Sequence, residues 1–165
     1  MKLQTPTSVT SEDVEMPRIE SEIRSCNLCT LSNTRKKAVP GEGPRDAKIM
    51  LIGEGPGHHE NEQGVPFVGA AGKLLDQLLE NVGLKRSDVY ITNVVKCRPP
   101  GNRDPQPIEI EACSKYLDRQ IDLINPRVIV TLGRFSMSRW FHGVRISDIH
   151  GQANRDGTRW VVHCL

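Results

Sequence analysis

The residues with the greatest chemical potential lie in one glycine-rich stretch, residues 53–72, which reads GEGPGHHENEQGVPFVGAAG. Its glycines let the backbone approach a ligand closely, and Glu54, Glu60 and Phe67 add carboxylates and an aromatic ring. The stretch follows the apolar run 47–52, which predicts a buried strand. Because open α/β sheets bind ligands beyond the carboxyl ends of their strands, we expect an active site in this stretch.

A nucleotide-binding loop and a purely structural loop are the other interpretations of this stretch. Its glycine spacing is not the dinucleotide-binding pattern G-x-G-x-x-G, because residue 58 is histidine, and no Lys-Ser or Lys-Thr pair follows to make a P-loop. A structural Ω-loop stays open, since glycine and proline are common in any loop. His58 and His59 are neighbours that cannot both face one site in regular structure, so we expect one or both to be exposed to solvent.

Four of the cysteines have a spacing that suggests a metal or cluster site. Cys26 and Cys29 form a C-x-x-C pair, Cys97 follows a predicted strand, and Cys113 lies on the next predicted helix. Four thiolates can hold zinc or a [4Fe–4S] cluster, but structural zinc usually takes two close pairs, so the spacing favours the cluster. Taken alone, Cys113 on an apolar helix stripe would be a small buried hydrophobe. We expect Cys164 to be a free thiol.

Strand and helix patterns alternate along the chain and would position these residues. Such alternation indicates an α/β fold, a three-layer sandwich with a central four-stranded parallel sheet flanked by helices. We expect residues 1–11 to be poorly ordered. Strands are predicted over residues 47–52, 88–95, 127–132 and 158–163, and helices over residues 11–25, 70–82, 107–124 and 136–141.

Length and charge set broad limits on the kind of protein. A chain of 165 residues is long enough to form one domain with its own core, and we expect residues 1–165 to do so. The net charge of +2 is compatible with nucleic-acid binding without indicating it. No run of residues is apolar and long enough to span a membrane, and no N-terminal secretion signal is evident. We therefore expect a soluble, cytoplasmic protein without a membrane partner.

Together these motifs resemble the family 4 uracil-DNA glycosylases, the iron–sulfur type of that superfamily. The resemblance runs in family order over most of the chain, and the combination is far more specific than any single motif. The matching segments are Cys26-x-x-Cys29, 41–44 (GEGP), 53–57 (GEGPG), 64–72 (GVPFVGAAG), 91–100 (ITNVVKCRPP) and Cys113.

The resemblance implies an enzyme of base-excision repair that hydrolyses the N-glycosidic bond of a flipped deoxyuridine in DNA and releases uracil. It assigns the [4Fe–4S] cluster to Cys26, Cys29, Cys97 and Cys113. The partner would be uracil-containing DNA, single- or double-stranded, and we expect the protein to be a monomer.

The same resemblance assigns roles around the substrate. Phe67 would stack on the flipped uracil, and Asn93 would hydrogen-bond its Watson–Crick edge, since an amide offers both a donor and an acceptor. Related families carry an aspartate where this chain has Gly55, so catalysis would rely on stabilising the departing uracil anion rather than on a carboxylate base. The implied catalytic residues are Asn93, Glu54 and Gly55, and the implied substrate-binding residues are Gly53, Glu54, Gly55, Glu60, Phe67 and Asn93.

The basic, proline-rich loop 96–103 is expected to contact DNA phosphates. Its prolines stiffen the backbone, so Arg98 and Arg103 could bind phosphate at a small ordering cost. A solvated cationic loop is the alternative, and it is stronger for Arg103 than for Arg98.

One motif of the family is not matched. The family carries His-Pro-x-x-x-Leu shortly after the last strand, and His163 is not followed by proline, so we interpret His163 as part of a strand. We expect the chain as given to lack the helix that this motif opens and to be a poor glycosylase. The alternatives are a non-catalytic iron–sulfur DNA-binding domain and a zinc-stabilised α/β domain for protein interaction.

Overall fold

The computed structural model of the chain describes residues 11–164, with side chains from residue 14 onward. The predicted disorder of residues 1–11 therefore lies, except for Ser11, outside the described residues. The helices are α1 (Ser11–Ser25), α2 (His58–Gln63), α3 (Ala70–Asn81), α4 (Pro107–Ile124), α5 (Arg134–Met137) and α6 (Ile146–Ile149). The strands are β1 (Ile49–Gly53), β2 (Tyr90–Asn93), β3 (Val128–Leu132), β4 (Ala153–Asp156) and β5 (Arg159–Cys164).

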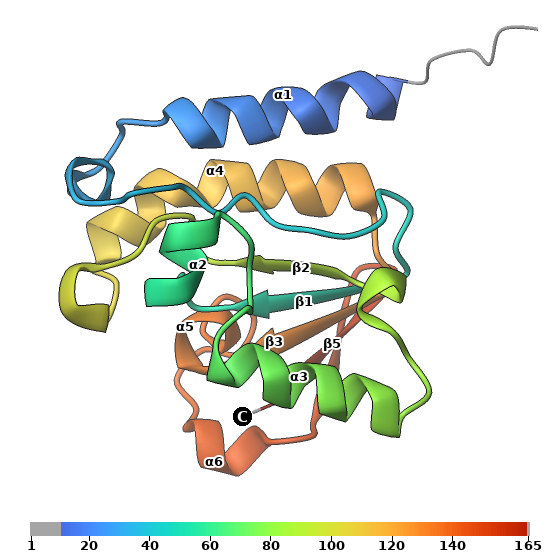
Figure 1. Cartoon of the computed structure of the whole chain (residues 1–165). Coiled ribbons are helices and arrows are strands. Elements are labelled where there is room, and N and C mark those ends of the chain that lie inside the picture. The colour runs from blue at the N-terminus through green and yellow to red at the C-terminus, as the bar shows by residue number, and fades with distance from the viewer. Residues whose placement is uncertain (1–10, 165) are drawn as a thin grey trace, which may run out of the picture.

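The strands form one sheet in the order β2-β1-β3-β5-β4 (Figure 1). Strands β2, β1, β3 and β5 run parallel to one another. The chain passes from β1 to a neighbour on one side, β2, and then to a neighbour on the other side, β3. Their carboxyl ends therefore meet at one edge of the sheet, and this change of direction is where open α/β sheets form ligand sites.

The sheet has five strands, whereas the sequence predicts four parallel strands. β4 pairs antiparallel with β5, so the sheet is mixed. Every residue of β4 is exposed, and its sequence Ala-Asn-Arg-Asp has none of the apolar alternation that indicates a strand. The two strands are joined by Gly157 and Thr158, and Gly157 has a φ of +60° that a tight hairpin needs. The sequence signal for this hairpin is the dipeptide Asp156-Gly157, which is typical of hairpin turns.

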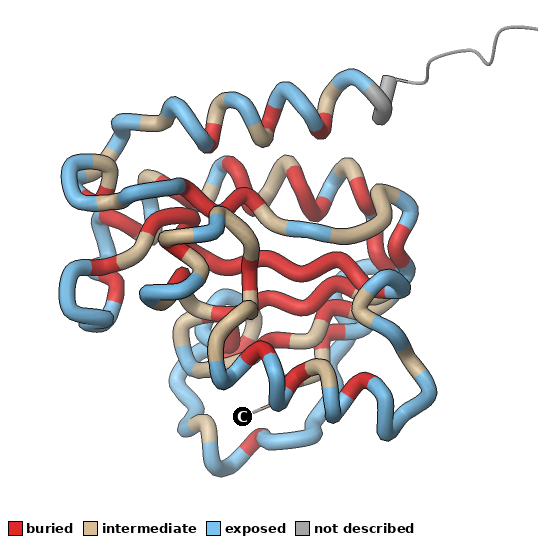
Figure 2. Tube along the Cα trace, viewed as in Figure 1, coloured by how far each residue is buried: buried red, intermediate tan, exposed pale blue. Residues whose placement is uncertain are grey.

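Helices cover both faces of the sheet, as the three-layer prediction requires. Helices α4 and α1 lie on one face and α3 on the other (Figure 1). The sheet divides the buried apolar residues into two clusters, because successive residues of a strand point to opposite faces. Met50 and Ile52 face α4, whereas Leu51 and Ile91 face α3. The buried segments follow the strands and the inner sides of these helices in Figure 2.

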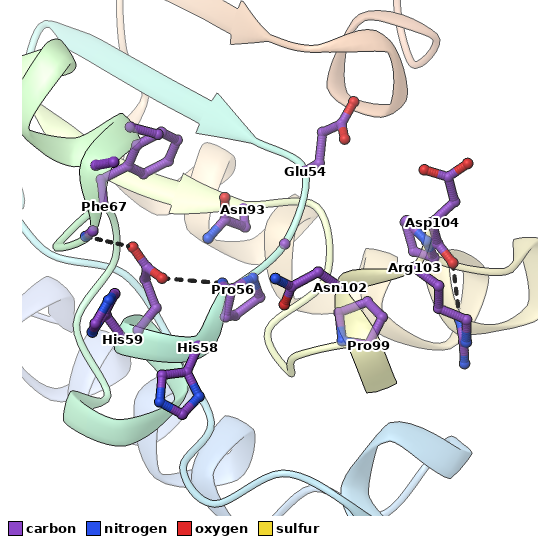
Figure 3. A pocket seen from close by; sticks show the side chains of 17 residues that line it. Glu54, Pro56, His58, His59, Phe67, Asn93, Pro99, Asn102, Arg103 and Asp104 are labelled. Atoms are coloured by element: carbon purple, nitrogen blue, oxygen red, sulfur yellow. Dashed lines mark hydrogen bonds between the residues drawn. The ribbon is translucent and has the colours of Figure 1, made fainter.

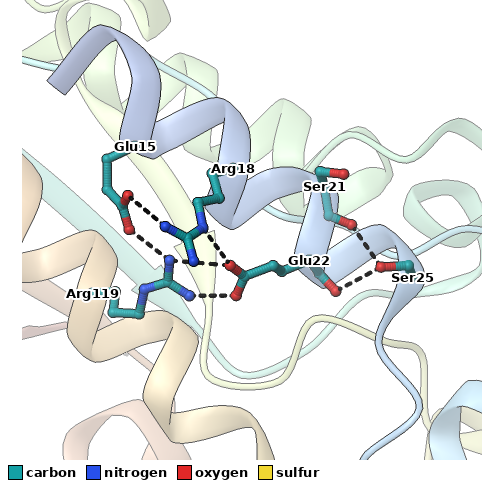
Figure 4. A network of polar contacts seen from close by, with 6 residues as sticks. All are labelled: Glu15, Arg18, Ser21, Glu22, Ser25 and Arg119. Carbon is teal, nitrogen blue, oxygen red and sulfur yellow. Dashed lines mark hydrogen bonds and ion pairs between the residues drawn. The ribbon is translucent and has the colours of Figure 1, made fainter. Parts of the chain in front are cut away.

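An ion-pair network fastens α1 to α4. Arg119 of α4 donates to Glu15 of α1 at 2.6 Å and to both carboxylate oxygens of Glu22, which also pairs with Arg18 (Figure 4). These groups are partly exposed, so each pair contributes little on its own. Most of the α1 contact comes from its buried apolar residues, Met16, Ile19 and Ile23.

The glycine-rich segment before β1 covers the outer edge of β2. Glu42 bridges to Ile91 through backbone hydrogen bonds of 2.9 and 2.7 Å. Gly41 and Gly43 have φ values of +139° and +138°. A Cβ on Gly43 would lie 2.3 Å from the Val89 carbonyl oxygen, so only glycine allows this approach.

Several predicted bounds are corrected. The loop after β1 contains helix α2, whose polar sequence lacks an apolar period. β2 is shorter than predicted, and α5 begins at Arg134 rather than at residue 136. Short 3₁₀ helices occur at Thr30–Asn33, Arg86–Asp88 and Pro100–Asn102. Within the described residues, no helix combines the length and the apolar character needed to cross a lipid bilayer.

Candidate active site

A pocket of about 510 Å³ opens beyond the carboxyl ends of β1 and β2. The glycine-rich stretch forms one wall, and the proline-rich loop after β2 forms the other (Figure 3). Of the residues proposed from sequence, the pocket brings together Glu54, Gly55, Glu60, Phe67, Asn93 and Arg103. The second wall also contains side chains that were not among the site residues predicted from the sequence, namely Pro99, Asn102, Asp104 and Pro105.

Asn93 lines this pocket, and Gly53, which is not part of the lining, lies directly beside it. They are register partners at the last positions of β1 and β2. A Cβ on Gly53 would lie 2.4 Å from Asn93 Oδ1 and 2.6 Å from Cζ of Phe67, so the absence of a side chain lets the amide and the ring come together. Asn93 is 2% exposed, and within the described residues its Oδ1 has no hydrogen-bond partner. An unpaired buried acceptor is costly unless a ligand completes it.

Phe67 is held in a strained backbone conformation. Its φ is +51°, which is unfavourable for a bulky residue. Arg86 donates to the carbonyl oxygen of Phe67 at 3.0 Å and to that of Pro66, and it pairs with Asp76 and Glu42. At Gly72, a Cβ would lie 1.8 Å from the Phe67 carbonyl oxygen. Arg86 and Gly72 thus permit and hold the turn that presents the aromatic ring.

Glu60 ties the ends of the loop together. Its Oε1 accepts hydrogen bonds from the backbone N–H groups of Val68 at 2.9 Å and Gly69 at 3.0 Å, and its Oε2 accepts one from Gly57 at 3.1 Å. Burial alone would raise the pKa of Glu60, but these backbone donors together lower it below its ordinary value. Glu60 is therefore ionised, and both of its carboxylate oxygens accept hydrogen bonds that hold the loop together.

Glu54 and Gly55 line the pocket immediately after β1. The Glu54 carboxylate points away from Asn93 in Figure 3, and its Oε1 accepts a 3.3 Å hydrogen bond from the backbone N–H of Phe135. The Glu54 carbonyl accepts from Val95 N–H at 3.0 Å. A Cβ on Gly55 would lie 2.8 Å from Val95 Cγ2. The chain after β1 thus packs directly against the chain after β2.

The proposed phosphate loop divides into three environments. Lys96 is 1% exposed, so the expectation that the whole of loop 96–103 faces phosphate is wrong at this residue. Arg103 makes hydrogen bonds of 2.9 and 2.7 Å with the two oxygens of buried Glu109 at the start of α4. Arg98 is half-buried, lies outside the pocket lining, and donates to Asn102 at 2.8 Å.

His58 and His59 open helix α2 on the rim of the pocket. Both are exposed, as expected, and their rings contact each other edge to face with centroids 5.4 Å apart. His163 is a strand residue, again as expected, and it is fully buried with Nδ1 at 2.9 Å from Thr131 Oγ1. It does not line the pocket.

Cys26, Cys29, Cys97 and Cys113 all line one small cavity of about 10 Å³ between α1, α4 and the loop after β2. Arg35 donates to Cys97 Sγ at 3.2 Å, and the backbone N–H of Lys96 donates to Cys113 Sγ at 3.3 Å. Burial raises the pKa of Cys97, and it raises that of Cys113 to about 11. Cys164 lies elsewhere as a half-buried free thiol.

In the described part of the chain, the cysteine cavity has the ligand types of an iron–sulfur site without the arrangement of a bound metal. Among the described side chains, no group of three or more His, Cys, Asp or Glu is arranged as a set of metal ligands. The donor types nevertheless suit a cluster, because four thiols share the cavity and the carboxylate in its lining, Glu109, is engaged by Arg103 and Thr30. Hydrogen bonds to the sulfurs, such as those from Arg35 and Lys96, are typical of iron–sulfur sites.

A model of the uracil DNA glycosylase superfamily matches residues 40–163. This span contains all of the pocket and two of the four cavity cysteines, Cys97 and Cys113. The chain belongs to the uracil-DNA glycosylase superfamily.

Individual relatives place the chain in the type-4 branch of that superfamily. A type-4 uracil-DNA glycosylase of Sulfurisphaera tokodaii is 59% identical over 122 residues, which are 73% of this chain and 56% of that protein. The enzyme of the same name from Saccharolobus solfataricus is 58% identical over 124 residues, 74% of this chain and 57% of that protein. That of Thermotoga maritima is 49% identical over 134 residues, 81% of this chain and 70% of that protein. The chain thus spans a little over half the length of the first two relatives.

Proposed function

We propose that this type-4 family member is a uracil-DNA glycosylase that hydrolyses the N-glycosidic bond of a flipped deoxyuridine. The observation that carries the proposal is the unpaired Oδ1 of Asn93 beside the ring of Phe67 in the pocket. Uracil offers an N3–H donor and an O4 acceptor side by side, and one amide can match both. A base inside a duplex must be extruded to reach such a pocket, and stacking and edge hydrogen bonds then hold it.

Phe67 would stack on the extruded base. Its ring stands next to Asn93, and its strained backbone is held by Arg86 before any substrate arrives. A preorganised aromatic face loses little freedom on binding. The backbone of Gly53, Glu54 and Gly55 would complete the wall around the base.

Catalysis would depend on stabilising the leaving group. Both oxygens of Glu60 already accept backbone hydrogen bonds, and the Glu54 carboxylate points away from Asn93. Neither is placed to act as a general base next to the base-binding end of the pocket. Asn93 Nδ2 would instead donate to uracil O4 as negative charge develops on the departing uracil.

Cys26, Cys29, Cys97 and Cys113 would hold a [4Fe–4S] cluster. When bound, the cluster would supply covalent cross-links between the end of α1, the loop after β2 and α4, and thus a structural function. The alternative of a zinc site has the same four ligands and the same structural consequence.

DNA would approach across the pocket mouth. Arg103 lines the pocket, and Arg98 lies on the same proline-rich loop and donates to Asn102 of the lining. We propose that both arginines bind phosphates rather than read bases. We expect the protein to act as a monomer in the cytoplasm, as a single domain.

The test is uracil release from oligonucleotides. The protein is incubated with single-stranded and duplex DNA carrying one deoxyuridine, and abasic sites are revealed by alkaline strand cleavage. The expected result is cleavage at the deoxyuridine and none in matched DNA carrying thymidine. Binding of the same DNA without base release would overturn the enzymatic proposal and favour the non-catalytic DNA-binding alternative.

A further inference from the structure

Lys96 connects the cysteine cavity to the back of the pocket. Its backbone N–H donates to Cys113 Sγ at 3.3 Å, and its side-chain Nζ donates to the carbonyl oxygen of Asn93 at 2.8 Å. The side chain is 1% exposed. The residue that belongs by sequence to a basic surface loop therefore lies inside the protein between the two sites.

The ammonium group of Lys96 has a complete set of acceptors. Besides the Asn93 carbonyl, it donates to Thr92 Oγ1 at 2.6 Å and to Gln120 Oε1 at 2.7 Å. Three acceptors match its three N–H bonds, which is the condition for burying such a charge. Thr92 and Gln120 in turn both donate to the Pro40 carbonyl, at 2.8 and 2.9 Å. The ammonium thus lies in a rigid polar network shared by β2, α4 and the segment before β1.

This network immobilises the peptide that follows Asn93. Lys96 holds the carbonyl oxygen of that peptide, and the Gly53 carbonyl accepts from its N–H, which belongs to Val94, at 2.9 Å. Both polar groups of one peptide are therefore engaged from opposite sides. Because the peptide plane is rigid, these two hydrogen bonds constrain the backbone at Asn93 and so the direction of its Cα–Cβ bond. The side chain that starts from this bond carries the unpaired Oδ1.

We propose that Lys96 is a positioning residue for Asn93. Its ammonium holds the Asn93 carbonyl so that the side-chain amide faces the base before the substrate arrives. The inference rests on the proposed function of the pocket. It predicts that removing the ammonium affects base recognition through Asn93, whereas a residue that only stabilises the core would affect folding alone.

The experiment is a double-mutant cycle between Lys96 and Asn93. Lys96→Met keeps the length and removes all three donors. We expect it to lower single-turnover uracil excision about tenfold, and we expect Lys96→Met/Asn93→Ala to be no slower than Asn93→Ala within about twofold. The matched control is Thr131→Val, a buried polar position on β3, whose effect should combine independently with that of Asn93→Ala. Independent effects of Lys96→Met and Asn93→Ala would overturn the proposal.

A binding measurement separates this inference from the proposed function. The probe is duplex DNA with one 2′-fluoro-deoxyuridine, which resists cleavage, compared with the same duplex carrying thymidine. If the unmodified protein neither excises uracil nor discriminates between the two duplexes, the proposed function fails. If it does both and Lys96→Met discriminates equally well, the role of Lys96 fails.

A second variant guards against loss of folding. Should Lys96→Met not fold, Thr92→Val removes one acceptor of the ammonium while keeping the shape of the side chain. We expect a smaller loss of discrimination that again disappears in the Asn93→Ala background. A loss that persists in that background would contradict the proposal.

Discussion

Arg86 holds the backbone of Phe67 in its left-handed conformation. The guanidinium donates to the carbonyl oxygens of Pro66 and Phe67, and it also pairs with Asp76 and Glu42. A φ of +51° costs a bulky residue about 1–3 kcal/mol and persists only where the surrounding structure enforces it. The aromatic wall of the pocket thus depends on a side chain that does not line it.

Removal of this guanidinium should release Phe67. We expect Arg86→Met to lower uracil excision by about tenfold or more, because misplaced positioning groups cost that much or more in rate. The measurement is single-turnover excision together with thermal unfolding. Lys85→Met, on the adjacent exposed side chain, is the control and should change neither. Equal excision by Arg86→Met and the unmodified protein would show that the ring needs no such support.

Glu60 should make the loop sensitive to acid. Its folded-state pKa lies below the ordinary value of 4.5, so the ionised form stabilises the native state. That stabilisation is fully present above pH 4.5 and is lost as the pH falls through the folded-state pKa. Glu60→Gln places an amide donor against backbone donors and should cost about 1 kcal/mol at pH 7.

The measurement for Glu60 is urea unfolding from pH 7 down to pH 3. The difference in free energy of unfolding between the unmodified protein and Glu60→Gln should become smaller as the pH falls. Glu80→Gln, an exposed position on α3, should behave like the unmodified protein throughout. If the difference in free energy of unfolding stays constant with pH, ionisation of the Glu60 carboxylate does not stabilise the native state.

The cysteines should differ in their effect on metal content. We expect Cys97→Ser to lose most of the iron and sulfide and to unfold at a lower temperature, because it removes a ligand from the shared cavity. Cys164→Ser should keep both, since Cys164 lies away from that cavity. Iron, sulfide and zinc analysis with visible absorption checks this. Zinc in place of iron would show that the cysteines hold zinc rather than an iron–sulfur cluster. Full iron retention by Cys97→Ser would show that Cys97 is not a ligand.

The two arginines should differ in DNA binding. Removing the charge of an arginine that contacts a phosphate makes the plot of log binding constant against log salt concentration less steep, by about 1 in the slope. Arg98→Gln should do so without loss of stability. Arg103→Gln also removes the ion-pair partner of the buried Glu109 carboxylate, so it should in addition destabilise the fold. Unchanged slopes in both variants would show that the loop has only a structural role.

Sequence patterns predicted the elements with clear apolar periods. α3 and α4 lie close to where helical spacing placed them, and β1 ends where the glycines begin. Parallel neighbouring strands bring their following loops together, so Asn93 and Phe67 could be assigned to one pocket before its shape was known.

Other features depend on partners distant in the chain. Lys96 is buried because Gln120 and Asn93 supply acceptors, and no local pattern distinguishes it from the exposed cations that follow. β4 was missed because its four residues are all exposed, and the support of Phe67 by Arg86 is visible only in three dimensions.

Asn93 offers the most direct test of the account. The measurement is the single-turnover rate of uracil release from one duplex by the unmodified protein and by Asn93→Ala, with both proteins shown to unfold at the same temperature. The account predicts a loss of about 10²–10³, the cost of one transition-state hydrogen-bond donor. Equal rates in two equally stable proteins would contradict it, because uracil would then be recognised and expelled without the amide at the back of the pocket.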